Sequence, residues 1–138
     1  MLYRQNRLIL WIVLPIALVA LAAGAAFAEY RYERHDLRKR AEALTNGDIE
    51  RGRTAFVNYG CGGCHTVKGV TQARGKVGPP LDGVGGRAII GGRLENKPDN
   101  LMRWIIDPQA VSPGTAMPNL GVQPRDARDI SAFLYMQS

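Results

Sequence analysis

The 138-residue chain is poor in cysteine and histidine, with two of each: Cys61, Cys64, His35 and His65. A disulfide framework needs more cysteines, and a structural zinc site needs four ligands, usually from two separate pairs. No second Cys or His pair exists in the sequence. We therefore exclude a disulfide-rich scaffold and a zinc module, and any stabilising group must use these few side chains differently.

The sequence also lacks a concentrated basic segment and is low in aromatic residues, at 7%. The net charge of +6 is split evenly, because residues 1–45 and residues 46–138 each carry an excess of three positive charges. Nucleic-acid-binding proteins instead gather Lys and Arg on one face, often with stacking aromatics. We exclude nucleic acid as a partner. A small basic group, Lys68, Arg74 and Lys76, indicates a docking rim for an acidic protein.

Charge is missing altogether from Leu8 to Ala28, a run of 21 residues. As a helix this run is about 31 Å long, which matches the hydrocarbon core of a bilayer. Ala26-Phe27-Ala28 resembles a signal-peptidase site, but the run exceeds the usual signal core, so we predict an uncleaved transmembrane anchor over residues 1–28. Arg4 and Arg7 predict a single pass in the cytoplasmic membrane, with the N-terminus cytoplasmic and the remainder in the periplasm or its equivalent.

Residues 29–45 contain no Gly or Pro and are rich in Arg, Glu, Ala and Leu. This composition predicts a helical stalk, which Asn46-Gly47 ends. Leu37 and Leu44 lie at roughly helical spacing on it. Two interpretations remain open: a solvated charged helix, or a Leu37/Leu44 stripe packed on another subunit. About ninety residues, 46–138, then remain for one domain, which at that size usually needs a cofactor, metal or disulfide for stability.

The two cysteines stand three positions apart and a histidine follows directly, as Cys61-Gly62-Gly63-Cys64-His65. This is the attachment pattern of c-type haem, in which two thioethers hold the porphyrin and the adjacent imidazole binds iron. A thioredoxin-like motif is disfavoured because neither Trp nor Pro lies between the cysteines. The sequence predicts one haem c bound covalently through Cys61 and Cys64, with His65 as an iron ligand.

The sixth iron ligand must come from His35, Met102, Met117 or Met136 if the site is closed. The first lies in the stalk, and the segments around Met102 and Met136 have helical character, so these three are more simply surface or core residues. Met117 lies in the irregular loop 113–118, which two prolines stiffen. We predict Met117 as the ligand, and His/Met ligation raises the reduction potential.

On these motifs, residues 48–138 resemble a class I cytochrome c, which implies an all-α haem domain. Gly52 to Phe56 matches the first helix, where glycine allows a close crossing by the last helix, whose apolar face matches Ile130, Phe133 and Leu134. The resemblance implies that the Pro79 carbonyl accepts a hydrogen bond from His65 and that Arg87 holds a haem propionate. It also implies that Trp104 lies beside the methionine side of the haem.

A narrower resemblance rests on the segment Asn100 to Gln109, followed by Pro113-Gly114 and Met117-Pro118. These residues are similar to the cytochrome c domain fused to subunit II of some haem-copper oxidases. The departure is that an anchor and a stalk stand where those proteins carry a copper-binding domain. The resemblance implies a connection with an oxidase.

Together these features predict a membrane-anchored, mono-haem electron-transfer protein and not an enzyme, because both axial positions of the iron are filled. It would take single electrons from a quinol-oxidising complex or a periplasmic dehydrogenase and pass them to a haem-copper oxidase, as a bound subunit or a tethered carrier. The alternatives are a haem subunit of a periplasmic dehydrogenase, or a haem enzyme or gas sensor with a labile Met ligand. The side chains expected to bury the ring are Phe56, Leu81, Trp104, Leu120 and Phe133.

Overall fold

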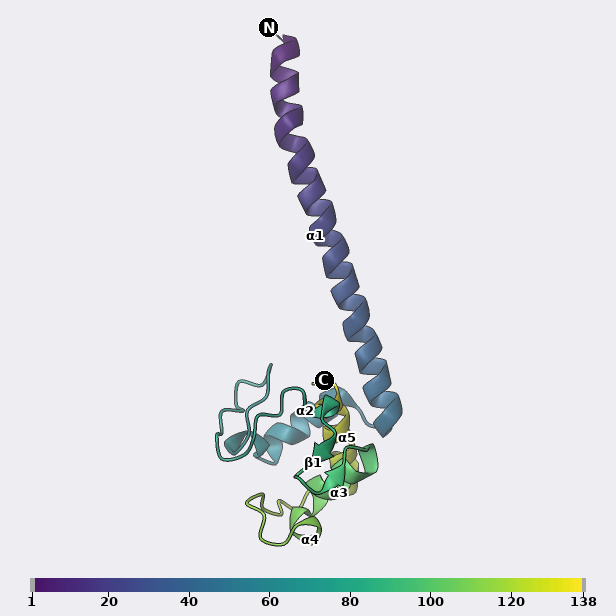
Figure 1. Ribbon diagram of the computed structural model, residues 1–138, viewed down its shortest axis with the longest axis vertical. Coiled ribbons are helices and arrows are strands. Elements are labelled where there is room, and N and C mark those ends of the chain that lie inside the picture. The colour runs from purple at the N-terminus through teal and green to yellow at the C-terminus, as the bar shows by residue number, and fades with distance from the viewer. Residues whose placement is uncertain (1, 138) are drawn as a thin grey trace. The chain divides into compact units, whose positions relative to one another are not determined.

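The computed structural model describes the backbone of residues 2–137 and the side chains of residues 11–137, and it divides into two compact units, Met1–Asp36 and Leu37–Ser138. As the sequence predicts, most of the described chain is helical. The structure also contains a short antiparallel hairpin that the sequence did not predict, in which Ile89 pairs with Glu95 and Ile90 with Leu94. The elements, in chain order, are α1 (Leu2–Thr45), α2 (Ile49–Asn58), the 3₁₀ turns η1 (Cys61–Gly63) and η2 (Val84–Gly86), β1 (Ile89–Ile90), β2 (Leu94–Glu95), α3 (Pro98–Ile106), α4 (Pro108–Val111) and α5 (Pro124–Tyr135) (Figure 1).

The first unit consists of the greater part of α1. From Trp11 to His35 every side chain of this helix is exposed, including the large apolar ones. Among the described residues, α1 is the one helix long and apolar enough to cross a membrane, judged by its length and composition. The side chains of Arg4 and Arg7, on which the predicted orientation rests, lie outside the described residues.

The last turns of α1 belong to the second unit and pack into its core. Ala41 and Thr45 are buried and Leu37 is partly buried, whereas Leu44 is 60% exposed. The packed face therefore repeats every four residues, through Leu37, Ala41 and Thr45, and it contacts the protein's own domain. The Thr45 hydroxyl donates to the Ala41 carbonyl at 2.8 Å. The helix ends there, because Asn46 adopts a positive φ of 52°.

Helices α2 and α5 cross in close contact at Gly52. A Cβ atom at this position would lie 1.8 Å from the backbone oxygen of Asp129, so no other residue fits. On the neighbouring turns the rings of Phe56 and Phe133 pack with their centroids 5.6 Å apart. The close crossing expected from the glycine is thus confirmed.

The carboxylate of Asp129 joins the same two helices through charge-assisted hydrogen bonds. It accepts from the Asp48 N–H at 2.8 Å and from Arg51 Nε at 2.7 Å, and its side chain is 4% exposed. The Asp48 side chain in turn caps the start of α2 by accepting from the Arg51 N–H at 2.8 Å. Burial raises the pKa of Asp129, but the hydrogen bonds from Arg51 and Asp48 and the charge of Arg51 outweigh it, so the net pKa is lowered.

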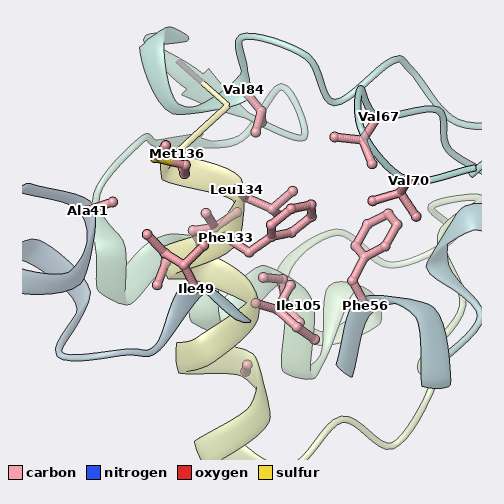
Figure 2. Close-up of a cluster of buried hydrophobic side chains, with 14 of the residues drawn as sticks. Ala41, Ile49, Phe56, Val67, Val70, Val84, Ile105, Phe133, Leu134 and Met136 are labelled. Atoms are coloured by element: carbon pink, nitrogen blue, oxygen red, sulfur yellow. The ribbon is translucent and has the colours of Figure 1, made fainter. Parts of the chain in front are cut away.

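The hydrophobic core is built around α5, which packs against both α2 and α3. Its buried side chains include Phe133 and Leu134, which meet Phe56 of α2 and Ile105 of α3 in one cluster (Figure 2). Pro124 at the first turn of α5 suits a helix start, since its missing N–H would have had no partner within the helix. The core thus packs α2 and α3 against α5, and these three helices frame the site described below.

The crossing at Gly52 makes a direct prediction. We expect Gly52→Ala to lower the free energy of unfolding by about 3 kcal/mol, because the helices must separate to accept the methyl group. Gly86→Ala is the control, since a Cβ there meets nothing within 4 Å. Thermal or denaturant unfolding of the haem-loaded protein measures both changes. Equal stability of the two variants would contradict the crossing geometry.

Asp129 predicts a dependence of stability on pH. Because its pKa is lower in the folded state, the unfolded chain binds the proton more readily, and folding loses stability as the pH falls below the ordinary aspartate value of about 4. We expect Asp129→Asn to cost about 2 kcal/mol at neutral pH, and this difference to shrink below pH 4. Denaturant unfolding between pH 7 and pH 3 measures it. A constant difference between the two proteins across this range would refute the assignment.

Candidate haem site

A largely apolar cavity of about 340 Å³ lies in the second unit. Its walls come from α2, η1, the hairpin, α3, α5 and the loops around residues 78 and 117. All seven residues that the sequence predicts as cofactor-binding line it: Cys61, Cys64, His65, Pro79, Arg87, Trp104 and Met117. The apolar lining includes Phe56, Leu81, Leu101, Ile105, Leu120, Val122, Ile130 and Leu134.

The Cys61–His65 segment is folded as a tight turn directly after α2. Gly60, with φ at 73°, reverses the chain, and the N–H groups of Cys64 and His65 both donate to the Cys61 carbonyl, at 3.2 and 3.0 Å. Gly62 is buried against the backbone of Ala73. A Cβ at this position would lie 2.8 Å from the Ala73 Cα atom, so a larger residue does not fit. The turn therefore presents both cysteines and the histidine to the cavity from one short stretch of backbone.

The two cysteines of this turn are not joined to each other by a disulfide. Burial raises the pKa of the Cys61 thiol to about 11. Two thiols at the edge of an apolar cavity fit thioether attachment of a flat hydrophobic ring.

The imidazole of His65 is oriented by the loop that follows the cysteines. Its Nδ1 lies 2.8 Å from the Pro79 carbonyl oxygen. A carbonyl oxygen accepts hydrogen bonds, so Nδ1 carries the proton and the lone pair of Nε2 is left for a metal. Gly78 lies against the ring, where a Cβ would be 2.3 Å from Cε1. The tautomer and the fixed orientation of the His65 ring are therefore those expected of a side chain that binds a metal.

Arg87 lies at the cavity edge and is exposed, and its guanidinium donates to the carbonyls of Pro80 and Asp82. Its own carbonyl accepts from the side-chain amide of Asn96 at 2.8 Å, which also donates to Val84. The Tyr135 hydroxyl donates to the Asn96 oxygen at 2.9 Å, and burial raises the pKa of Tyr135. Sequence analysis missed Asn96 and Tyr135, because no local pattern marks partners 39 residues apart.

Trp104 forms part of the cavity wall, and the hairpin turn passes close to its indole ring. Gly91, with φ at 54°, passes so close that a Cβ would lie 2.5 Å from the indole ring. A side chain at this position would displace the ring. The glycine in the hairpin turn therefore holds the indole against the cavity.

The four residues considered as a sixth ligand differ in their surroundings. Met117 is half-buried and lines the cavity, whereas Met136 is buried in the core and Met102 is partly buried against that core. His35 is exposed on α1. The cavity thus brings Met117 together with His65 and leaves the other three outside its lining.

The expected set of ring-burying side chains needs one correction. Phe56, Leu81, Trp104 and Leu120 line the cavity, but Phe133 does not, because its ring packs against Phe56 in the core. Ile130 and Leu134, four residues apart on α5, lie in the cavity wall instead. A shift of one position along a helix turns a side chain by about 100°, and an apolar stripe does not tell which of its members faces the cofactor.

The donor groups of the cavity match a haem. The described residues contain no group of three or more His, Cys, Asp or Glu that could hold a metal ion by themselves. One imidazole and one thioether are too few for a bare transition metal, but they complete an iron whose other four positions are filled by a porphyrin. The apolar walls and the two thiols suit the ring itself.

Comparison with known proteins gives the same answer. Residues 49–137 match the family model described as cytochrome c. Two cytochrome c oxidase subunits 2 are similar, from Alkalihalophilus pseudofirmus (42% identity over 77 residues) and a Bacillus species (38% over 76 residues), covering 56% and 54% of this chain. The matched region is 20% and 21% of those proteins, so the chain spans about a fifth of their length.

Cytochrome c-550 from Nitrobacter winogradskyi is 36% identical over an alignment of 89 residues, and the match covers 56% of this chain and 78% of that protein. No solved structure is significantly similar to the chain. The family match covers residues 49–137, which is most of the unit Leu37–Ser138 that contains the cavity. The chain belongs to the cytochrome c family, as a class I c-type cytochrome whose single haem c is attached covalently through Cys61 and Cys64.

Proposed function

We propose that this cytochrome is a membrane-anchored carrier of single electrons in a respiratory chain, with a haem-copper oxidase as the acceptor. The observation that carries the proposal is the cavity in which Cys61, Cys64, His65 and Met117 meet among apolar side chains. The haem iron supplies a reversible one-electron change between its ferric and ferrous states. The apolar walls keep water away and reduce the rearrangement of solvent that each change of charge requires.

In this proposal His65 and Met117 are the two axial ligands. Pro79 keeps the imidazole in one orientation through its carbonyl, Arg87 holds a propionate, and Trp104 covers the ring on the methionine side. Ligation of the iron by both side chains would leave no open coordination position for oxygen or peroxide. The protein therefore transfers electrons and does not make or break bonds in a substrate.

The oxidase enters as the acceptor because both oxidase subunits above carry a region similar to this domain. The donor is a quinol-oxidising complex or a periplasmic dehydrogenase. Lys68, Arg74 and Lys76 are exposed around the haem-binding segment, and they form the docking rim for an acidic partner. Redox encounters often bury less than about 1,200 Å², so a small rim suffices.

Helix α1 is the anchor, since its apolar part has the length of a bilayer core and its side chains are exposed. The N-terminus is cytoplasmic and the haem domain lies in the periplasm or its equivalent. Leu37 and Ala41, at the end of α1, pack into the domain, and residues 29–45 contain no Gly or Pro, a composition unlike that of a flexible linker. This composition favours a bound subunit over a freely swinging carrier.

The ligand assignment makes a spectroscopic prediction. We expect Met117→Ala to abolish the charge-transfer band between the thioether and ferric iron and to lower the reduction potential substantially, because thioether ligation favours reduced iron. Met102→Leu is the matched control, since Met102 packs against the core outside the cavity lining, and it should keep both properties. Visible spectra and redox titration measure them. An unchanged band in Met117→Ala would refute the assignment.

The partner is tested by separating native membrane complexes in mild detergent, staining for covalent haem, and identifying what migrates with the 15.1 kDa chain by mass spectrometry. We expect co-migration with a haem-copper oxidase. Co-migration with a dehydrogenase would replace the proposed partner. Migration of the haem-loaded chain alone would replace the bound subunit with a tethered carrier.

A further inference from the structure

The side chain of Gln109 makes three hydrogen bonds, and all three reach the loop that contains Met117. Its Nε2 donates to the carbonyl of Thr115 and to the carbonyl of Met117 itself, each at 2.8 Å. Its Oε1 accepts from the N–H of Gly114 at 3.1 Å. One carboxamide thus contacts the loop at three of four successive residues, including the proposed ligand.

This loop has few other means of holding its shape. Among the described residues, the one backbone–backbone hydrogen bond made by residues 113–122 runs from the Thr115 N–H to the Ser112 carbonyl, at 3.1 Å. Pro113 and Pro118 have no N–H to donate. Within this bonding pattern, the backbone of Met117 is tied to the rest of the domain through the Gln109 side chain.

Gln109 is itself held by a short, well-anchored helix. It is the second residue of α4, directly after Pro108, which is among the most completely buried side chains of the described chain. The carboxylate of Asp107 caps the same helix by accepting from the Ala110 N–H at 3.0 Å. The carboxamide therefore begins from a fixed backbone position, and its hydrogen bonds transmit that position to the loop.

The three bonds also require a carboxamide. Two hydrogens on one nitrogen meet two carbonyls, and the oxygen meets an N–H, a combination that Asn and Gln alone offer. An ionised Glu would place a carboxylate against two carbonyl oxygens, and a Lys would leave the Gly114 N–H without its acceptor. The residue type is thus matched to the loop and not merely tolerated.

We propose that Gln109 is the positioning residue for the Met117 ligand, holding the thioether at the cavity and opposing its release from iron. The inference rests on the proposed function, since it takes Met117 as the sixth ligand. It also explains how an electron carrier would differ from a haem protein with a labile methionine. The iron site stays closed only if the loop that contains Met117 rarely opens, and the Gln109 hydrogen bonds oppose that opening.

The test uses the full-length, haem-loaded protein in detergent and imidazole as a competing ligand for ferric iron. Imidazole binds when Met117 is released, so its apparent affinity rises with the population of the open loop. We expect Gln109→Ala to bind imidazole about tenfold more tightly or better, because three hydrogen bonds to the closed loop are lost. Gln123→Ala is the matched control, since its carboxamide donates to Gly121 and makes none of the hydrogen bonds to residues 114–117 that Gln109 makes. It should leave the affinity unchanged.

Gln109→Glu supplies a second readout within one folded protein. At neutral pH its carboxylate donates nothing, so the thioether-to-iron band should be weak. On acidification the carboxyl group takes up a proton and regains one donor, so the band should recover. Wild type should show no such recovery. A general loss of stability in the domain would weaken the band on acidification instead.

The outcomes separate the two proposals. Wild-type imidazole affinity in Gln109→Ala, together with a band in Gln109→Glu that does not recover, overturns the role of Gln109 while Met117→Ala still loses its band. If Met117→Ala keeps the band and the wild-type imidazole affinity, the ligand assignment fails, and the role of Gln109 falls with it. Should Gln109→Ala not fold, the pH profile of Gln109→Glu decides.

Discussion

The close crossing of α2 and α5 at Gly52 is the contact on which the remaining structure depends. The absence of a side chain there brings α2 to within van der Waals distance of the Asp129 backbone. Two parts of the site are continuous with these two helices. The end of α2 leads directly into the Cys61–His65 turn, and Ile130 and Leu134 of α5 supply part of the cavity wall. Moving the helices apart would shift the cysteines relative to that wall.

Buried or partly buried polar side chains also hold separate parts of the domain together, at three places. Asp129 joins the start of α2 to α5, Asn96 joins the Arg87 segment to Tyr135 of α5, and Gln109 joins α4 to the Met117 loop. The first connects two helices, and the other two connect an irregular segment to a helix through side-chain hydrogen bonds. Irregular loops leave many backbone groups without partners from regular structure, and buried groups of this kind must be satisfied. A small domain with much loop therefore relies on a few such side chains to hold its cofactor in place.

The features that could be predicted from the sequence are those that a local pattern of residues determines. The spacing of Cys61, Cys64 and His65, the helical character of the final segment and the irregular loop around Met117 all follow from neighbouring residues, and the family resemblance supplied Pro79 and the glycine crossing. Sequence analysis did not identify Asn96 or Gln109 as structural ties, because their partners depend on the final packing. It also expected Phe133 at the ring and left the packing of Leu37 open, since an amphipathic stripe does not tell which neighbour each member meets.

The central claim is that one haem is bound on opposite sides by His65 and Met117. Proton NMR of the reduced, full-length protein tests it most directly, because a methionine methyl bound to diamagnetic haem iron lies above the ring and is shielded by its current. The account predicts a single three-proton resonance shifted far upfield of the ordinary methyl region, and its absence in Met117→Ala. A reduced spectrum without such a resonance, or one that survives the loss of Met117, would contradict the account.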